Sequence, residues 1–141
     1  MQSVQINYLA VIIAAVLNLV LGMLWYGPVF GRYWKKLMGF TDESMKSMKM
    51  TPAKAMIGGL LSAFLMSYVL AHCIVFAGAY FAVSGVSAGL MSGFWNWLGF
   101  VVPVSAGVVL WEGKPWKLWF LNVSFWLVAL LLMGALLAVW R

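Results

Sequence analysis

Four apolar runs constrain this chain more than any other feature of its sequence. They lie at about residues 6–26, 54–76, 87–110 and 116–139, and each is close to or longer than the roughly 20 residues that a helix needs to cross about 30 Å of hydrocarbon. Charged residues make up only 9% of the chain, compared with about 25% in soluble domains. The sequence therefore predicts an all-α membrane protein whose four transmembrane helices form a single bundle over residues 1–141.

Basic residues lie almost entirely in two of the loops between these runs. Eight of the nine do so: Arg32, Lys35, Lys36, Lys46, Lys49, Lys54, Lys114 and Lys117. By the positive-inside rule both loops are cytoplasmic, which predicts that the N-terminus and the C-terminus lie outside. We expect a bacterial inner (cytoplasmic) membrane, in which the net charge of +6 meets anionic lipid head groups and not nucleic acid.

The segment 29–50 predicts one or two short amphipathic helices at the inner interface. Gly27 and Pro28 are expected to end the first transmembrane helix, because glycine can close a helix in the left-handed conformation and proline cannot continue one. Apolar side chains then recur at helical spacing through Met38, which is typical of a helix that lies in the interface. The residues expected at this interface, including those of the second basic loop, are Trp34, Lys35, Lys36, Glu112 and Lys114.

Turn and cap residues subdivide this segment. Gly39 is expected to end the first short helix, and Thr41 is expected to cap a second one. Thr51 followed by Pro52 is a cap and first-turn pair. The second transmembrane helix should therefore begin just before Lys54.

Two parts of the chain resemble a known family. Residues 25–34 read WYGPVFGRYW and look like its W-Y-G-P-x-F-G-x-x-W signature, while residues 97–103 and 112–118 are similar to its third and fourth helices and the turn between them. The family is one of small bacterial membrane proteins catalogued as a domain of unknown function. The resemblance implies a four-helix integral membrane protein and gives no activity, substrate or catalytic residue.

Small residues recur every four positions on the second and third helices. Such residues let helix backbones approach closely in lipid, so we expect these two helices to pack on each other. The third helix carries two adjacent ladders, which is more than one neighbour requires and favours a homo-oligomer. The ladders are Gly59, Ala63, Ser67 and Ala71 on the second helix, and Ser84, Ala88, Ser92 and Asn96 beside Gly85, Gly89 and Gly93 on the third.

Polar residues inside the apolar runs are candidates for a solute-binding site, because they are costly in lipid unless they are paired or hydrated. At about 1.5 Å rise per residue, Asn18 and Asn96 fall near the midplane, and Asn122 falls in the inner third. Ser92 and His72 could extend a polar track. The alternative is that the two midplane amides fasten helices together by bonding to each other or to backbone, and that His72 is merely satisfied or solvated at the outer interface.

Two further groups of side chains carry open alternatives. Trp95 and Trp97 flank Asn96, where they could line a cavity for an apolar or cationic guest or could face lipid. Glu112 is close to Lys114 and Lys117. It could form an ion pair with one of them, or it could bind an ion or a lipid head group.

The residue inventory ranks the classes of function. Catalysis needs a nucleophile, base or metal in mutual reach, and one Cys, one His and three acids offer no such set, so we expect no enzyme, no metal site and no cofactor. The leading hypothesis is passage or binding of a small solute or ion through an uncharged polar site in an oligomeric bundle. A structural or regulatory membrane subunit is the alternative hypothesis.

Overall fold

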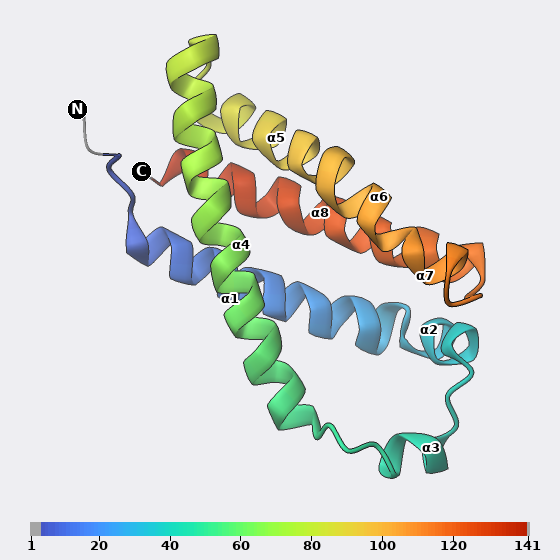
Figure 1. The fold of residues 1–141 in the computed structure, drawn as a ribbon. Helices are drawn as coiled ribbons and strands as arrows, with labels where there is room; N and C mark the ends of the chain where they lie inside the picture. Colours follow the sequence, from blue (N-terminus) through green and yellow to red (C-terminus); the bar gives the residue numbers. More distant parts are fainter. Residues whose placement is uncertain (1–3, 141) are drawn as a thin grey trace.

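A computed structural model describes residues 4–140 of the chain. Four of its helical segments are long and apolar enough to cross a membrane, and they span Tyr8–Val29, Pro52–Phe81, Gly85–Leu110 and Trp116–Val139. No strand occurs among the described residues. The predicted all-α fold with four transmembrane helices is confirmed (Figure 1).

The first crossing consists of α1 (Tyr8–Leu24) and the π-helical turn η1 (Trp25–Val29). The Asn7 side chain caps α1 by accepting a hydrogen bond from the Ala10 amide, 3.1 Å away. The expectation that Gly27 closes this helix in the left-handed conformation is wrong, because its φ is −105° and its ψ is −106°. The chain instead kinks at Gly27 and continues to Val29, so the first crossing ends about one turn later than expected.

Two short helices follow, as predicted. Helix α2 (Gly31–Met38) ends at Gly39, whose φ of 74° is the left-handed conformation that glycine adopts at little cost. Helix α3 (Asp42–Lys46) starts at Thr41, whose hydroxyl accepts from the Ser44 amide at 3.1 Å while the Ser44 hydroxyl lies 2.9 Å from the Thr41 amide. This reciprocal pair forms a capping box.

The second crossing, α4 (Pro52–Phe81), is longer than its predicted range of 54–76. It begins as predicted, with the Thr51 hydroxyl accepting from the Lys54 amide and Pro52 in the first turn. Its C-terminal end continues through Gly78 to Phe81 and is capped by Ala82, which has a φ of 54°. Consequently only residues 82–84 separate α4 from α5.

The third crossing is interrupted, whereas the fourth is regular. The third crossing consists of α5 (Gly85–Asn96), the π-helical η2 (Trp97–Val101), α6 (Val102–Ser105) and α7 (Gly107–Leu110). Pro103 lacks the amide hydrogen that would continue the bonding pattern, which accounts for an irregular stretch beside it. The fourth crossing, α8 (Trp116–Val139), has the predicted bounds.

The core lies where α1, α4, α5 and α8 meet. In Figure 1, α4 crosses steeply over α1, so only its middle part is enclosed, and residues 52–62 are all exposed. One polar contact holds α4 against α1, since the Ser67 hydroxyl of α4 donates to the Val11 carbonyl of α1 at 2.7 Å. The core residues are Ala10, Val11, Ala14, Leu70, Ala71, Ile74, Ala88, Leu130, Met133, Leu137 and Ala138.

Gly89 and Gly93 of the third crossing pack closely on α8 and not on α4, so the predicted close pairing of the second and third helices through these glycines is wrong. A methyl group added at Gly89 would overlap the Gly134 carbonyl, and one at Gly93 would lie 2.5 Å from the Leu130 carbonyl. The middle of the other ladder is also enclosed, because Ala88 and Ser92 are buried within the single chain. The surplus of small residues that favoured a homo-oligomer is therefore used inside one bundle.

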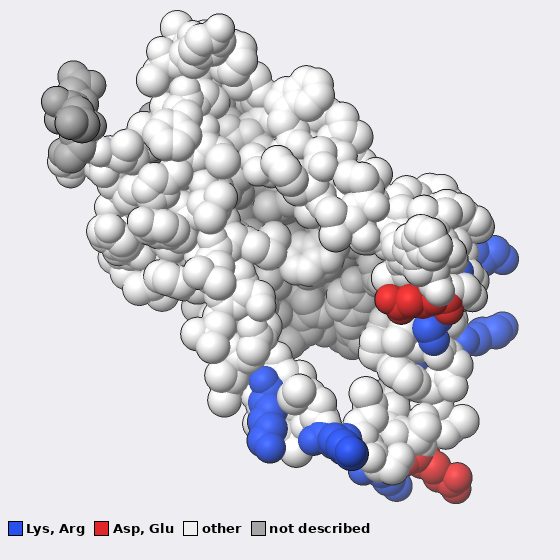
Figure 2. All heavy atoms as spheres, viewed as in Figure 1, with Lys and Arg blue, Asp and Glu red and all other residues white. Residues whose placement is uncertain are grey.

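Charged side chains gather at one end of the molecule. Figure 2 shows the lysines, arginines and acids of this face around α2, α3, the start of α4 and the turn between α7 and α8. We call this the basic end. The surface of the helices away from it is uncharged in this view, as expected of a surface in contact with hydrocarbon.

Candidate functional site

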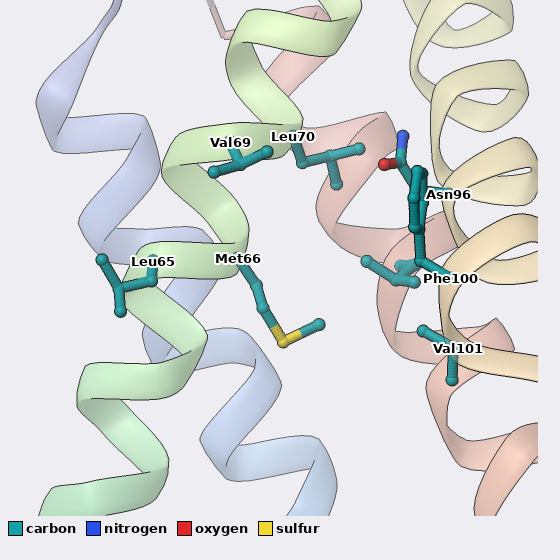
Figure 3. Close-up of a pocket in the computed structure, with 8 residues that line it drawn as sticks. Leu65, Met66, Val69, Leu70, Asn96, Phe100 and Val101 are labelled. Carbon is teal, nitrogen blue, oxygen red and sulfur yellow. The ribbon is translucent and has the colours of Figure 1, made fainter. Parts of the chain in front are cut away.

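A cleft of about 520 Å³ opens between α4 and the third crossing. Figure 3 shows one wall formed by side chains of α4 and the opposite wall formed by side chains of α5 and η2, and the space-filling view is hollowed between the same segments. Leu130 of α8 closes the cleft on a third side. The lining residues are Leu65, Met66, Val69, Leu70, Asn96, Phe100, Val101 and Leu130, and we call this site the Asn96 cleft.

Helical spacing accounts for both walls. Leu65 with Val69, and Met66 with Leu70, are pairs four residues apart, which places each pair on the same face of α4. On the opposite wall, Phe100 follows Asn96 by four residues and lies in the π-helical η2. Single π turns within longer helices are frequent at functional sites.

Asn96 supplies the only amide among the lining residues, and seven of the eight are apolar. Its side-chain nitrogen donates to the Ser92 carbonyl of the same helix at 2.8 Å. Its oxygen has no hydrogen-bond partner among the described residues, and Figure 3 shows it on the side of the cleft that faces α4. An acceptor without a partner in apolar surroundings is costly, so a guest that donates a hydrogen bond would be stabilised here.

The other amides do not join Asn96. Asn18 of α1 is 7% exposed, and its side-chain oxygen has no partner among the described residues. The Ser92 hydroxyl is also buried, and it has no partner within residues 4–140. Of the two kinds of bond in the alternative interpretation, a bond between Asn18 and Asn96 is absent from the described chain, whereas Asn96 does bond to backbone, although within its own helix. Neither Asn18 nor Ser92 lines the cleft.

Three further candidates lie outside the cleft. Trp95 is 61% exposed on the bundle surface, as the lipid-facing interpretation requires. Trp97 points the other way, and its indole N–H donates to the Val123 carbonyl of α8 at 2.8 Å. His72 is half-buried, with Nδ1 2.9 Å from the Tyr68 carbonyl of its own helix and its ring against that of Tyr68. Its Nδ1 is therefore engaged within its own helix.

Three of the five residues predicted at the inner interface meet Asn122 around a second cavity. Trp34, Glu112, Lys114 and Asn122 line this space of about 490 Å³ at the basic end. Lys35 pairs with Asp42 at 3.8 Å, and this is the one ion pair of residues 4–140. The expected ion pair of Glu112 with Lys114 or Lys117 is consequently absent from the described chain. Lys36 is exposed and does not line the cavity.

Sequence reasoning identified Asn96 and Asn122 but missed most of their neighbours. Met66 and Phe100 carry no signal of function by themselves. The four-residue spacing of Phe100 from Asn96 does, however, place those two residues on one helix face. Tyr26 is a further missed neighbour, since its hydroxyl donates to the Asn122 side-chain oxygen at 2.8 Å across the bundle. No local pattern connects residues 96 positions apart.

The two cavities differ in the chemistry they allow. The Asn96 cleft has no charged lining residue, so it suits an uncharged guest. The second cavity combines aromatic rings with a carboxylate and an ammonium group. Within residues 4–140, no three His, Cys, Asp or Glu side chains come together as metal ligands.

Comparison with known proteins places the chain in a family. The family described as "Protein of unknown function (DUF1761)" matches residues 9–138, which is most of the 141 residues. The chain belongs to this family, and the resemblance to a family of unknown function is confirmed. No curated protein and no solved structure matches the chain.

Proposed function

We propose that this member of a family without an assigned activity binds an uncharged, largely apolar molecule in the Asn96 cleft, from within the bilayer. The observation that carries the proposal is an unpartnered amide oxygen facing a cleft whose other lining residues are apolar. Pockets for small molecules are typically lined by apolar side chains with a few polar groups that fix orientation. The Asn96 cleft has this composition.

Size and charge narrow the class of ligand. The volume of about 520 Å³ falls within the roughly 300–1,000 Å³ that is usual for small-molecule sites. An ion would lose its hydration without finding a countercharge among the lining residues. A hydroxyl or amide N–H on an otherwise apolar molecule, in contrast, would satisfy the Asn96 oxygen.

Binding is favoured over ion passage by the separation of the polar groups. A conducting pore needs a continuous row of polar groups or backbone carbonyls. Asn96 and Asn122 line two different cavities, and Asn18 lines neither of them. A structural or regulatory subunit, the alternative hypothesis, would have no ligand in the cleft.

Replacing Asn96 by leucine should remove the preference for a ligand that donates a hydrogen bond. The probes are a long-chain primary alcohol and its methyl ether, which has the same chain but no donor. We expect the wild type in nanodiscs to prefer the alcohol by about two- to tenfold, because a hydrogen bond contributes about 0.5–1.5 kcal/mol. Competition of each compound against a fluorescent analogue of the alcohol measures both affinities.

Asn122→Leu is the matched control, because it makes the same change outside the cleft. It should keep the preference, whereas Asn96→Leu should bind the alcohol and the ether equally. Folded amounts are matched by size-exclusion chromatography. The proposal would be refuted if the wild type bound both probes equally, if Asn96→Leu kept the preference, or if neither probe bound. Absence of binding would favour the structural hypothesis.

We also propose that the basic end is cytoplasmic in a bacterial inner membrane, with both termini outside. The gathering of charged side chains at one end supports this orientation through the positive-inside rule. In a Cys73→Ser background, Lys49→Cys should be protected from an impermeant thiol reagent in intact cells. Tyr80 is 84% exposed near the opposite end of α4, so Tyr80→Cys should react with the same reagent. The reverse labelling pattern would show the opposite orientation.

A further inference from the structure

The second cavity, at the basic end, has a different chemical character from the Asn96 cleft. It lies between the end of the first crossing, α2, the end of the third crossing and the start of α8. Its volume is about 490 Å³. The residues relevant to recognition are Tyr26, Trp34, Glu112, Lys114, Asn122 and Trp126.

The turn around η1 builds the aromatic wall of this cavity. The Phe30 amide donates to the Trp25 carbonyl at 2.8 Å, which closes the wide turn that contains Pro28. Gly31 is required there, because an added methyl group would lie 2.6 Å from the Tyr26 carbonyl. This turn places the Trp34 ring of α2 edge-to-face against the Tyr26 ring, with a distance of 5.8 Å between the ring centroids.

Hydrogen bonding among the described residues leaves one amide donor group free in the cavity. The Tyr26 hydroxyl donates to the Asn122 oxygen at 2.8 Å, and this bond holds the amide in place. The Asn122 nitrogen has no acceptor among the described residues. It is therefore available to donate to an oxygen atom of a ligand.

Two opposite charges line the same cavity without neutralising each other. Lys35 and Asp42 form the single ion pair among residues 4–140, so Glu112 and Lys114 are both unpaired in the described chain. A ligand that is only anionic would be repelled by the Glu112 carboxylate, and one that is only cationic would be repelled by Lys114. A zwitterion can satisfy both groups.

We propose that this cavity binds a zwitterionic head group that carries an ammonium and a phosphate, as in phosphatidylethanolamine. The ammonium would contact Glu112 and the faces of the aromatic rings. The phosphate would accept from Lys114 and from the Asn122 amide. Aromatic and basic residues at the end of a membrane bundle lie at the level of lipid head groups, so a lipid is favoured over soluble phosphoethanolamine as the source.

Lipid titrations of the purified protein in detergent test this proposal by native mass spectrometry. The probes are phosphatidylethanolamine, phosphatidylglycerol, which has the phosphate but no ammonium, and soluble phosphoethanolamine. We expect Glu112→Gln to weaken binding of phosphatidylethanolamine by about fivefold, the scale of an exposed ion pair, and to leave phosphatidylglycerol binding no weaker. Lys114→Gln should weaken both lipids.

Glu43→Gln and Lys46→Gln are the matched controls, since they make the same charge changes on exposed residues of α3 outside the cavity. Both should bind lipids as the wild type does. Glu112-dependent binding of soluble phosphoethanolamine as strong as that of the lipid would support the same site chemistry with a soluble ligand. The proposal is overturned if Glu112→Gln and Glu43→Gln are indistinguishable, or if the wild type prefers phosphatidylglycerol.

Discussion

Adding a single methyl group at Gly89 or at Gly134 is expected to destabilise the bundle strongly. At Gly89 the methyl group would overlap the Gly134 carbonyl and lie 2.8 Å from the Ala138 Cβ, and at Gly134 it would overlap the Gly89 carbonyl. Backbone atoms of two packed helices cannot move aside as a flexible side chain can. We therefore expect Gly89→Ala and Gly134→Ala each to reduce the free energy of unfolding by about 3 kcal/mol, the upper end of the usual cost of overpacking.

Gly58→Ala is the control for this prediction. It makes the same change in a transmembrane helix, at a position where nothing lies within 4 Å of the added methyl group. Thermal unfolding of the three variants in the same detergent should give a much lower Tm for Gly89→Ala and Gly134→Ala than for the wild type, and an unchanged Tm for Gly58→Ala. Three equal Tm values would show that α5 and α8 do not pack this closely.

The course of the chain was predictable because its determinants are local. Residues 116–139 form a helix with the predicted bounds, and Thr41, Thr51 and Gly39 act where their side chains or backbone freedom suggest. A cap depends on residues three or four positions away, and a transmembrane run depends on its own composition. The error at Gly27 is also local, because the π-helical turn lets the chain pass Pro28 without a left-handed glycine.

Helix partners were not predictable by the same reasoning. A row of small residues indicates that another helix packs closely against it, but it does not indicate which helix that is. Gly89 could have met α4 or α8, and the steep crossing of α4 over α1 leaves α8 as its neighbour. Gly134, which has no conspicuous ladder in the sequence, is the contact point on α8.

The candidate site was predictable in part. Depth along a helix follows from residue counting, so Asn96 was identified as a polar group in the apolar interior. Depth does not give direction, however, and Asn18 has its own buried position away from the cleft. Trp95 and Trp97 show the same limit, because one faces outward and the other bonds to α8. The α4 wall of the cleft depends on the crossing of that helix, which no local pattern encodes.

Replacing Val69 by phenylalanine should exclude a long-chain alcohol from the Asn96 cleft. Val69 lines the cleft and is 54% exposed, so Val69→Phe narrows the cleft while the bundle remains folded. Overpacking typically costs about 1–3 kcal/mol, which predicts roughly tenfold weaker occupancy or more. Val16→Phe is the matched control, because Val16 is 41% exposed on α1 and lies outside the cleft.

The most direct test of ligand binding in the Asn96 cleft is to map where a long-chain alcohol with a diazirine in its chain attaches to the protein in nanodiscs. Peptide mass spectrometry should locate the adducts on cleft residues such as Met66, Val69 and Phe100. These adducts should be lost in Val69→Phe, retained in Val16→Phe, and displaced by the unlabelled alcohol more readily than by its methyl ether. Adducts spread evenly over the exposed apolar residues of all four crossings, and unaffected by Val69→Phe, would contradict a binding site at Asn96.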